Sequence, residues 1–241
     1  MNAKEDIINF YAKQLRIPSF TRYKEVLRQK ESMGYEEFLI AMMKQELESR
    51  SANQQKRRIK AAGFPYQKSL EELNLSLFVH VEEAFIHELA TCDYIKNRQN
   101  LLMIGQPGGG KTHLSIALGL KACQAGFAVK FTTAATLATL LVEARDQKEL
   151  SKLEKQIQKA DLLIIDELSY LSFNRHQSEL LFKVISDRAE RSSVIISTNL
   201  EFSRWTEMFE NPMLVAALVD RLTFRSHVLN MNNRSYRMTQ D

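Results

Sequence analysis

The most informative stretch of the sequence is LLMIGQPGGGKTHL, residues 101–114. Its four leading apolar residues predict a buried strand, and the residues from Lys111 to Cys123 predict a helix. Between them, Gly105 to Thr112 match G-x-x-x-x-G-K-[ST] at every fixed position. Glycines allow the backbone N–H groups of such a loop to face inward, and the helix that follows presents its positive end to an anion. The stretch therefore predicts a loop that binds the phosphates of ATP.

Two side chains of this loop have specific expected roles. Lys111 is expected to reach the β- and γ-phosphates, and the Thr112 hydroxyl to ligate Mg²⁺. The alternative is a glycine-rich turn that binds nothing, but the preceding strand and the following helix favour the phosphate loop. The predicted nucleotide-binding residues are Gly105, Gln106, Pro107, Gly108, Gly109, Gly110, Lys111, Thr112 and His113.

Polar residues end two further apolar runs. Leu162–Ile165 is followed by Asp166 and Glu167, and the run from Val194 is followed by Asn199. Parallel strands place such residues at the carboxyl edge of a sheet, where ligands bind. We expect Asp166 to hold Mg²⁺, Glu167 to act as the base towards the attacking water, and Asn199 to contact the γ-phosphate or that water. The alternatives are a strand that simply exits to solvent and a capping Asn at a loop start.

The spacing of apolar runs predicts the architecture of the C-terminal part. Helical stretches alternate with the short runs, which is typical of a parallel sheet covered on both faces. Two helices are expected within residues 137–159, with a break near Asp146–Lys148. The predicted fold is an α/β ATPase domain, residues 76–241, with a five-stranded parallel sheet. Its expected strands are 101–104, 127–132, 162–165, 194–197 and 227–231.

The N-terminal part, residues 1–75, is expected to be a small helical domain for self-association or partner binding. Its first 60 residues contain one glycine and one proline, Pro18, which breaks the first helix. A helix from Tyr35 is expected to place Phe38, Met42 and Leu47 near one face. Residues 54–68 carry five basic residues and no acid, which indicates a basic helix end and turn or a solvated linker.

Composition narrows the class of protein. Of 241 residues, 44% are hydrophobic and 26% charged, an ordinary globular balance, and the net charge of +4 leans towards an anionic partner. The two cysteines and five histidines have no metal or redox spacing, so neither a disulfide framework nor a zinc site is expected. The N-terminus does not resemble a signal peptide and no apolar run reaches 18 residues, so a cytoplasmic protein without a membrane segment is expected.

Taken together, the phosphate loop, the acidic strand end and the strand-ending asparagine resemble those of the AAA+ ATPases. The resemblance is greatest to the DnaC/IstB group, through GQPGGGKTHLSIALG, LLIIDELSYL, VIISTN and DRLTFRSHVLNMNNRSYRM. AAGFPYQKSLEELN also resembles the segment that precedes the ATPase domain in IstB-type proteins. The chain is thus similar, over about residues 35–240, to the IstB-type transposition helper ATPases, with DnaC/DnaI-type helicase loaders second.

The resemblance implies roles for three more positions. Asn199 corresponds to the first sensor. Arg221 corresponds to an arginine finger, which acts in a neighbour's ATP site and implies a homo-oligomeric ring or spiral. The alternative for Arg221 is an ion pair with Asp220 or Glu210. Arg237 stands at the second-sensor position, although Asn233 replaces the family's glycine.

The resemblance also extends to nucleic acid. Initiator-type AAA+ proteins have an extra helix between the second and third strands that lines a DNA channel, and two helices fit there in this chain. Several cations lie in this stretch at largely helical spacing, which predicts binding to duplex DNA with weak sequence preference. A merely solvated helix face is the alternative. The candidate DNA-binding residues are Arg145, Lys148, Lys152, Lys155 and Lys159.

The function that these features imply is a Mg²⁺-dependent ATPase that assembles on duplex DNA and recruits and stimulates a transposase. The alternative is a DnaC-like helicase loader that acts near single-stranded DNA. A stand-alone metabolic kinase is disfavoured by Glu167 and Asn199.

Overall fold

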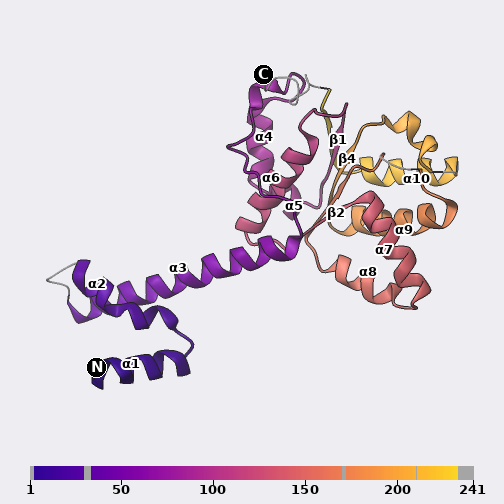
Figure 1. The fold of residues 1–241 in the computed structure, drawn as a ribbon. Helices are drawn as coiled ribbons and strands as arrows, with labels where there is room; N and C mark the ends of the chain where they lie inside the picture. Colours follow the sequence, from indigo (N-terminus) through magenta and orange to yellow (C-terminus); the bar gives the residue numbers. More distant parts are fainter. Residues whose placement is uncertain (1–2, 30–33, 170–171, 210, 233–241) are drawn as a thin grey trace. The chain divides into compact units, whose positions relative to one another are not determined.

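The computed structural model describes residues 3–29, 34–169, 172–209 and 211–232. Contacts group the chain into two compact units, residues 1–57 and 58–241 (Figure 1). The domain boundary predicted from the sequence lies later, after residue 75. Residues 58–75 belong instead with the second unit, because Ala62, Leu70 and Leu73 are buried in its core. Within the part of the chain that is described, no helix is long and apolar enough to cross a membrane.

The first unit is helical. It comprises α1 (Ala3–Gln14), the 3-10 helix η1 (Pro18–Arg22), α2 (Tyr23–Gln29) and the first part of α3 (Tyr35–Ala62), which continues into the second unit. The expected apolar face of α3 was wrong for Leu47, which is 67% exposed, whereas Met42 is fully buried. Five residues turn a helix by about 500°, so Leu47 points about 140° away from Met42.

One buried carboxylate joins the elements of this unit. Glu46 on α3 accepts the backbone N–H of Ser19 at 3.0 Å and the Nε–H of Arg50 at 2.7 Å. Burial alone would raise the pKa of Glu46, but the hydrogen bonds from Arg50 and Ser19 outweigh it, and the pKa is lowered. Glu46 therefore ties η1 to α3 as a charged group.

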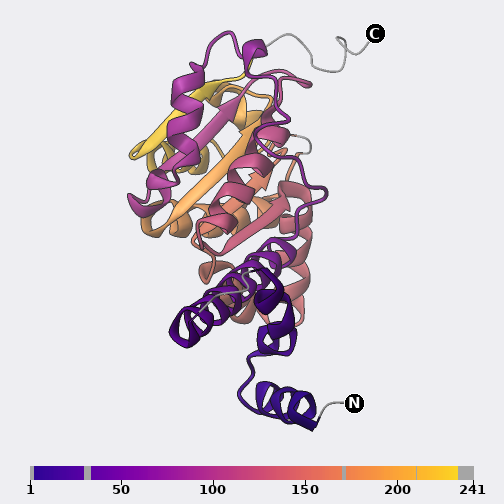
Figure 2. The same cartoon turned by 90° about the vertical axis from the view of Figure 1, so that its left-hand side faces the viewer.

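The second unit is built on one parallel sheet with the strand order β2-β3-β4-β1-β5. Figure 2 shows its strands side by side behind α4 and α6. The five predicted strands are confirmed within one or two residues at each end. They are β1 (Asn100–Ile104), β2 (Val129–Thr133), β3 (Leu162–Asp166), β4 (Ser193–Thr198) and β5 (Ser226–Asn230).

Helices cover both faces of this sheet (Figure 1). Alternate residues of each strand enter opposite cores: Leu101 and Met103 pack in one, and Leu102 in the other. Both faces are thus apolar, which is why the strands read as unbroken apolar runs. One face carries α4 (Glu83–Ala90), α5 (Asp93–Lys96) and α6 (Lys111–Gln124), preceded by η2 (Leu75–Leu77). The other carries α7 (Ala134–Asp146), α8 (Leu150–Gln158), α9 (Arg175–Arg191), η3 (Phe202–Glu207) and α10 (Pro212–Thr223).

Removing the carboxylate of Glu46 should loosen the first unit. We expect Glu46→Ala to cost roughly 1–3 kcal/mol, because it leaves the buried N–H of Ser19 without an acceptor. Since the pKa of Glu46 is lowered on folding, its contribution is complete above the unfolded value of 4.5 and is lost as the pH falls through the folded value. Faster hydrogen exchange in residues 17–23 would report the loss. Glu48→Ala, an exposed neighbour, is the control; equal exchange in both variants would contradict the role.

Candidate nucleotide-binding site

The phosphate loop joins β1 to α6 and depends on glycine at several points. Gly108 and Gly110 have φ values of 84° and 86°, in the left-handed region that glycine adopts without strain. A Cβ on Gly105 or Gly109 would lie only 2.3 Å from backbone atoms of Met231. The loop is therefore held against the chain that leaves β5, at a distance that only glycine permits.

Lys111 points its ammonium group back into this loop. The residue is 8% exposed, and its Nζ donates to the carbonyl oxygens of Gly105, at 2.5 Å, and Gln106, at 2.8 Å. Burial lowers the pKa of Lys111 to about 8, against the opposing charges of Asp166 and Glu167. The loop thus holds a desolvated cation inside a ring of backbone atoms.

Two of the residues predicted to serve Mg²⁺ lie together. The Thr112 hydroxyl, at the start of α6, donates to Oδ2 of Asp166, at the end of β3, at 2.8 Å. The buried Ser197 of β4, which the sequence analysis did not single out, donates to Oδ1 of Asp166 and accepts the N–H of Glu167 at 2.9 Å. Because β4 lies between β1 and β3, Ser197 holds the two acids from the strand next to the one that carries the loop.

Glu167 and Asn199 follow neighbouring strands at this same edge. Glu167 is exposed and has a φ of 56°, a left-handed conformation that costs a side chain other than glycine about 1–2 kcal/mol. Strain of this kind clusters at functional sites. Asn199 is also exposed, and its backbone N–H donates to the hydroxyl of Ser169, in the loop after β3, at 2.8 Å.

The segment after β5 completes the loop's surroundings. Met231 donates its N–H to the carbonyl of Ile104 at 2.6 Å, and Asn232 Oδ1 accepts the N–H of Gln106 at 3.1 Å. Neither residue was predicted to lie at the site, because nothing in their local sequence says that β5 lies beside β1. His113 turns away from the loop: its Nε2 lies 3.1 Å from the carbonyl of Ser69, and burial lowers its pKa.

A cavity of about 290 Å³ lies where two loop-contacting segments run together. Phe78, whose ring lies against Gly110, precedes one wall, and Met231 follows the other. Four of its lining residues are apolar, and the other two are a histidine and a glutamate. Its lining residues are His80, Val81, Glu82, Phe85, Val228 and Leu229. None of these residues was predicted from the sequence to lie at the nucleotide-binding site.

Arg221 lies near the amino ends of the strands, whereas the phosphate loop lies at their carboxyl ends. The amide of Asn100, at the start of β1, donates to the carbonyl of Leu222, so one five-residue strand, about 16 Å, separates Arg221 from the loop. Its Nε pairs with Glu190 at 2.9 Å, not with the neighbouring Asp220, and its guanidinium lies 5.3 Å from the ring centroid of Phe182. Arg237, like Glu210, lies outside the described residues.

The predicted DNA-binding cations do not form one face. Arg145 ends α7 and pairs with Asp146, and Lys152 on α8 pairs with Glu149. Lys148 lies in the turn between the two helices, with a φ of 59°. The remaining pair is Lys155 and Lys159. Both are exposed and, within the described part of the chain, form no ion pair.

The sheet order and the loop define a P-loop protein with the AAA+ fold. Solved structures of similar fold include DnaA of Aquifex aeolicus bound to AMPPCP (TM-score 0.58, 18% identity, 72% of this chain and 53% of that one). The DnaC helicase loader is another (TM-score 0.55, 22% identity, 73% and 98%). More specifically, the chain belongs to the family described as IstB-like ATP binding protein, whose model matches residues 11–241.

Relatives in sequence are named for ATP binding in insertion sequences. One, from the insertion sequence IS21 of Pseudomonas aeruginosa, is 35% identical over 211 residues, which is 88% of this chain and 80% of the relative. An IS21-like one from Bacteroides fragilis is 30% identical over 238 residues, 98% of this chain and 90% of the relative. The family resemblance noted from the motifs is therefore confirmed.

Removing the Lys111 ammonium should abolish nucleotide binding. We expect Lys111→Ala to weaken the affinity for a fluorescent ATP analogue by at least about 100-fold, because a charge-assisted hydrogen bond in a desolvated site contributes roughly 1.5–3 kcal/mol and its coulombic attraction adds to that. Lys183→Ala, which removes an exposed lysine from α9, is the control. Retained affinity in Lys111→Ala would show that nucleotide binds elsewhere.

Proposed function

We propose that this protein is a Mg²⁺-dependent ATPase that assembles on duplex DNA and recruits and stimulates a transposase. The observation that carries the ATPase part is the hydrogen bond between Thr112 and Asp166 beside the loop that buries Lys111. It brings together a phosphate-binding cation and two oxygen ligands that the sequence separates by 54 residues. The names of the relatives support the link to insertion sequences.

The oxygen donors fit a magnesium ion. A hydroxyl and a carboxylate are ligands that Mg²⁺ prefers, and it takes few of them from protein when a nucleotide supplies the rest. In the described residues no group of three or more His, Cys, Asp or Glu could hold a metal, which agrees with a metal carried in by the nucleotide. Thr112 and Asp166 would hold the ion, which neutralises phosphate charge when bound.

The chain's own groups have distinct tasks in this proposal. Lys111 exchanges its contacts with the carbonyls of Gly105 and Gln106 for contacts with phosphate oxygens. Glu167, fixed by its backbone N–H on Ser197, orients the attacking water and accepts its proton, and Asn199 from the next strand assists. The cavity between Phe85 and Val228 takes the adenine, since it is apolar and adjoins the loop.

Assembly is supported by two features. Arg221 is too far from this chain's own loop to act there, so an arginine-finger role requires a neighbouring subunit. The first unit also exposes apolar side chains at helical spacing, more than single scattered residues would explain. They are Ile7, Phe10 and Tyr11 on α1 with Leu15 just after it, and Leu39, Ile40, Met43 and Leu47 on α3. We propose these two stripes as the surface for self-association or for the transposase.

A helicase loader is the second candidate function. The fold similarity to the DnaC helicase loader favours it, and DnaA has been solved with single-stranded DNA (TM-score 0.54, 19% identity). These similarities concern the fold alone. The relatives found in insertion sequences share more of their sequence with this chain, which favours the transposition helper.

Replacing Glu167 by Gln should separate binding from turnover. The amide keeps the size of the side chain but cannot accept a proton, so we expect ATP affinity to stay within about threefold and turnover to fall roughly 100-fold or more. The variant should accumulate in the ATP-bound, assembled form. Glu201→Gln, an exposed acid beyond β4, is the control. Phosphate release at the normal rate by Glu167→Gln would exclude this residue from the mechanism.

Lys155 on α8 and Lys159 just after it should contribute to DNA binding. We expect duplex DNA to bind with a salt dependence that weakens in Lys155→Gln/Lys159→Gln by about 0.9 in the slope of log affinity against log salt for each DNA phosphate that is no longer neutralised. The matched control is Arg175→Gln/Lys183→Gln, which removes two cations already paired with acids. Binding would be measured with a non-hydrolysable ATP analogue. The same salt slope in all three proteins would contradict the assignment.

A further inference from the structure

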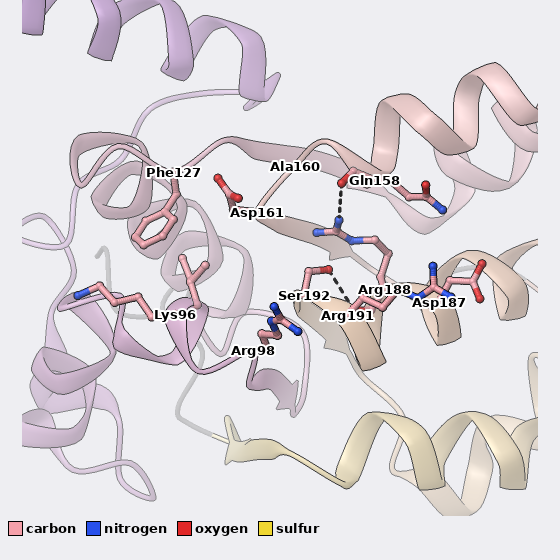
Figure 3. A pocket seen from close by; sticks show the side chains of 11 residues that line it. Lys96, Arg98, Phe127, Gln158, Ala160, Asp161, Asp187, Arg188, Arg191 and Ser192 are labelled. Carbon is pink, nitrogen blue, oxygen red and sulfur yellow. Dashed lines mark hydrogen bonds between the residues drawn. The ribbon is translucent and has the colours of Figure 1, made fainter.

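A cavity of about 510 Å³ lies at the amino edge of the sheet. Its walls come from the end of α5, the turn before β2, the end of α8 and the last turn of α9 (Figure 3). These segments all lead into the first residues of strands, whereas the phosphate loop follows the last residue of β1. The cavity is therefore separate from the nucleotide-binding site.

Arg188 is the unusual residue of this cavity. It is 4% exposed, and its Nη1 donates to the carbonyl oxygens of Ile157, at 3.4 Å, and Gln158, at 3.3 Å, at the end of α8. Its Nε and Nη2 atoms have no hydrogen-bond partner in the described part of the chain. Burial lowers the pKa of Arg188 to about 10, which leaves the guanidinium charged at neutral pH. A buried cation with unpaired donors is costly unless something binds to it.

The unpaired nitrogens form a particular edge of the guanidinium. The N–H of Nε and one N–H of Nη2 run parallel, which is the arrangement that grips a carboxylate or phosphate with two hydrogen bonds. Asp161 lies near but is already engaged: its Oδ2 accepts the N–H of Ala128 at 2.8 Å. The Nε–Nη2 edge of Arg188 therefore has no carboxylate bound to it in the described part of the chain.

Other cations surround this fork. Arg98 and Arg191 line the same cavity, are exposed, and form no ion pair with any described residue. Lys96 pairs with Asp93 at 2.7 Å. Figure 3 shows the Arg188 guanidinium directed towards Gln158, with Arg98 below it in this view. The three guanidinium groups outnumber the two carboxylates of the lining, Asp161 and Asp187, neither of which forms an ion pair in the described part of the chain.

We propose that this cavity is a second anion site that binds a phosphate group. Arg188 donates through its Nε–Nη2 edge, and Arg98 and Arg191 close on the remaining oxygens. Both free nitrogens of Arg188 are shielded from solvent, so binding of the anion requires a lining side chain to move. The phosphate is either free or part of a DNA backbone. The inference rests on this cavity's geometry and does not depend on the proposed ATPase activity.

Inorganic phosphate is titrated into the full-length Lys111→Ala protein, and binding is measured by calorimetry. The substitution weakens phosphate binding at the phosphate loop, so the titration reports on the proposed second site. We expect saturable binding that weakens about tenfold when Arg188→Lys is added, because lysine keeps the charge but loses the fork. Arg98→Gln/Arg191→Gln should weaken it comparably and, being at exposed positions, should leave folding intact. Arg175→Gln, at the other end of α9 and paired with Glu179 at 3.0 Å, should change nothing.

Absence of saturable phosphate binding, or equal binding in all these variants, would overturn the proposal. Duplex DNA then identifies the source of the phosphate. If Arg98→Gln/Arg191→Gln also lowers the salt slope of DNA binding relative to Arg175→Gln, the site holds a backbone phosphate. If DNA binding is unchanged while inorganic phosphate still depends on Arg188, the site takes free phosphate. Either result supports the anion site.

Discussion

The hydrogen bond from the Thr112 hydroxyl to the Asp166 carboxylate connects the end of β1 to the end of β3 across β4. It can form only if the sheet has this strand order and if both strands run in the same direction. Ser197 then fixes the other oxygen of Asp166 and the backbone of Glu167 from the strand between them. The site's geometry therefore depends on the parallel sheet, and the sheet's two apolar cores hold that geometry rigid.

Much of this could be predicted from the sequence, because the decisive signals are local. A phosphate loop between a strand and a helix, and carboxylates after an apolar run, each lie within a dozen residues. The five strands could be predicted for the same reason. The roles of Met231 and Asn232 could not be predicted, since their contacts with Gly105 and Gln106 cross more than 120 residues. The same holds for Ser197, which looked like one more polar residue at a strand end.

The surroundings of the basic side chains were harder to predict from the sequence than the helices and strands. The spacing from Lys148 to Lys159 suggested one basic helix face, but Lys148 lies in the turn before α8 and Lys152 pairs with Glu149. Lys155 on α8 and Lys159 just after it form no ion pair with a described residue. Arg188 drew no attention in the sequence, where it is one of two arginines in the last turn of α9. Only its burial, with two unpaired donors, distinguishes it. Two separate buried cations thus lie at opposite ends of the strands, Lys111 at the carboxyl ends and Arg188 at the amino ends.

We propose that nucleotide at the phosphate loop drives assembly on duplex DNA. Particle size, measured by light scattering on duplex and on single-stranded DNA with and without ATP, tests it most directly. We expect large particles only with ATP and duplex DNA together. Assembly on single strands alone, or no assembly until a helicase is added, would contradict it and favour the helicase loader.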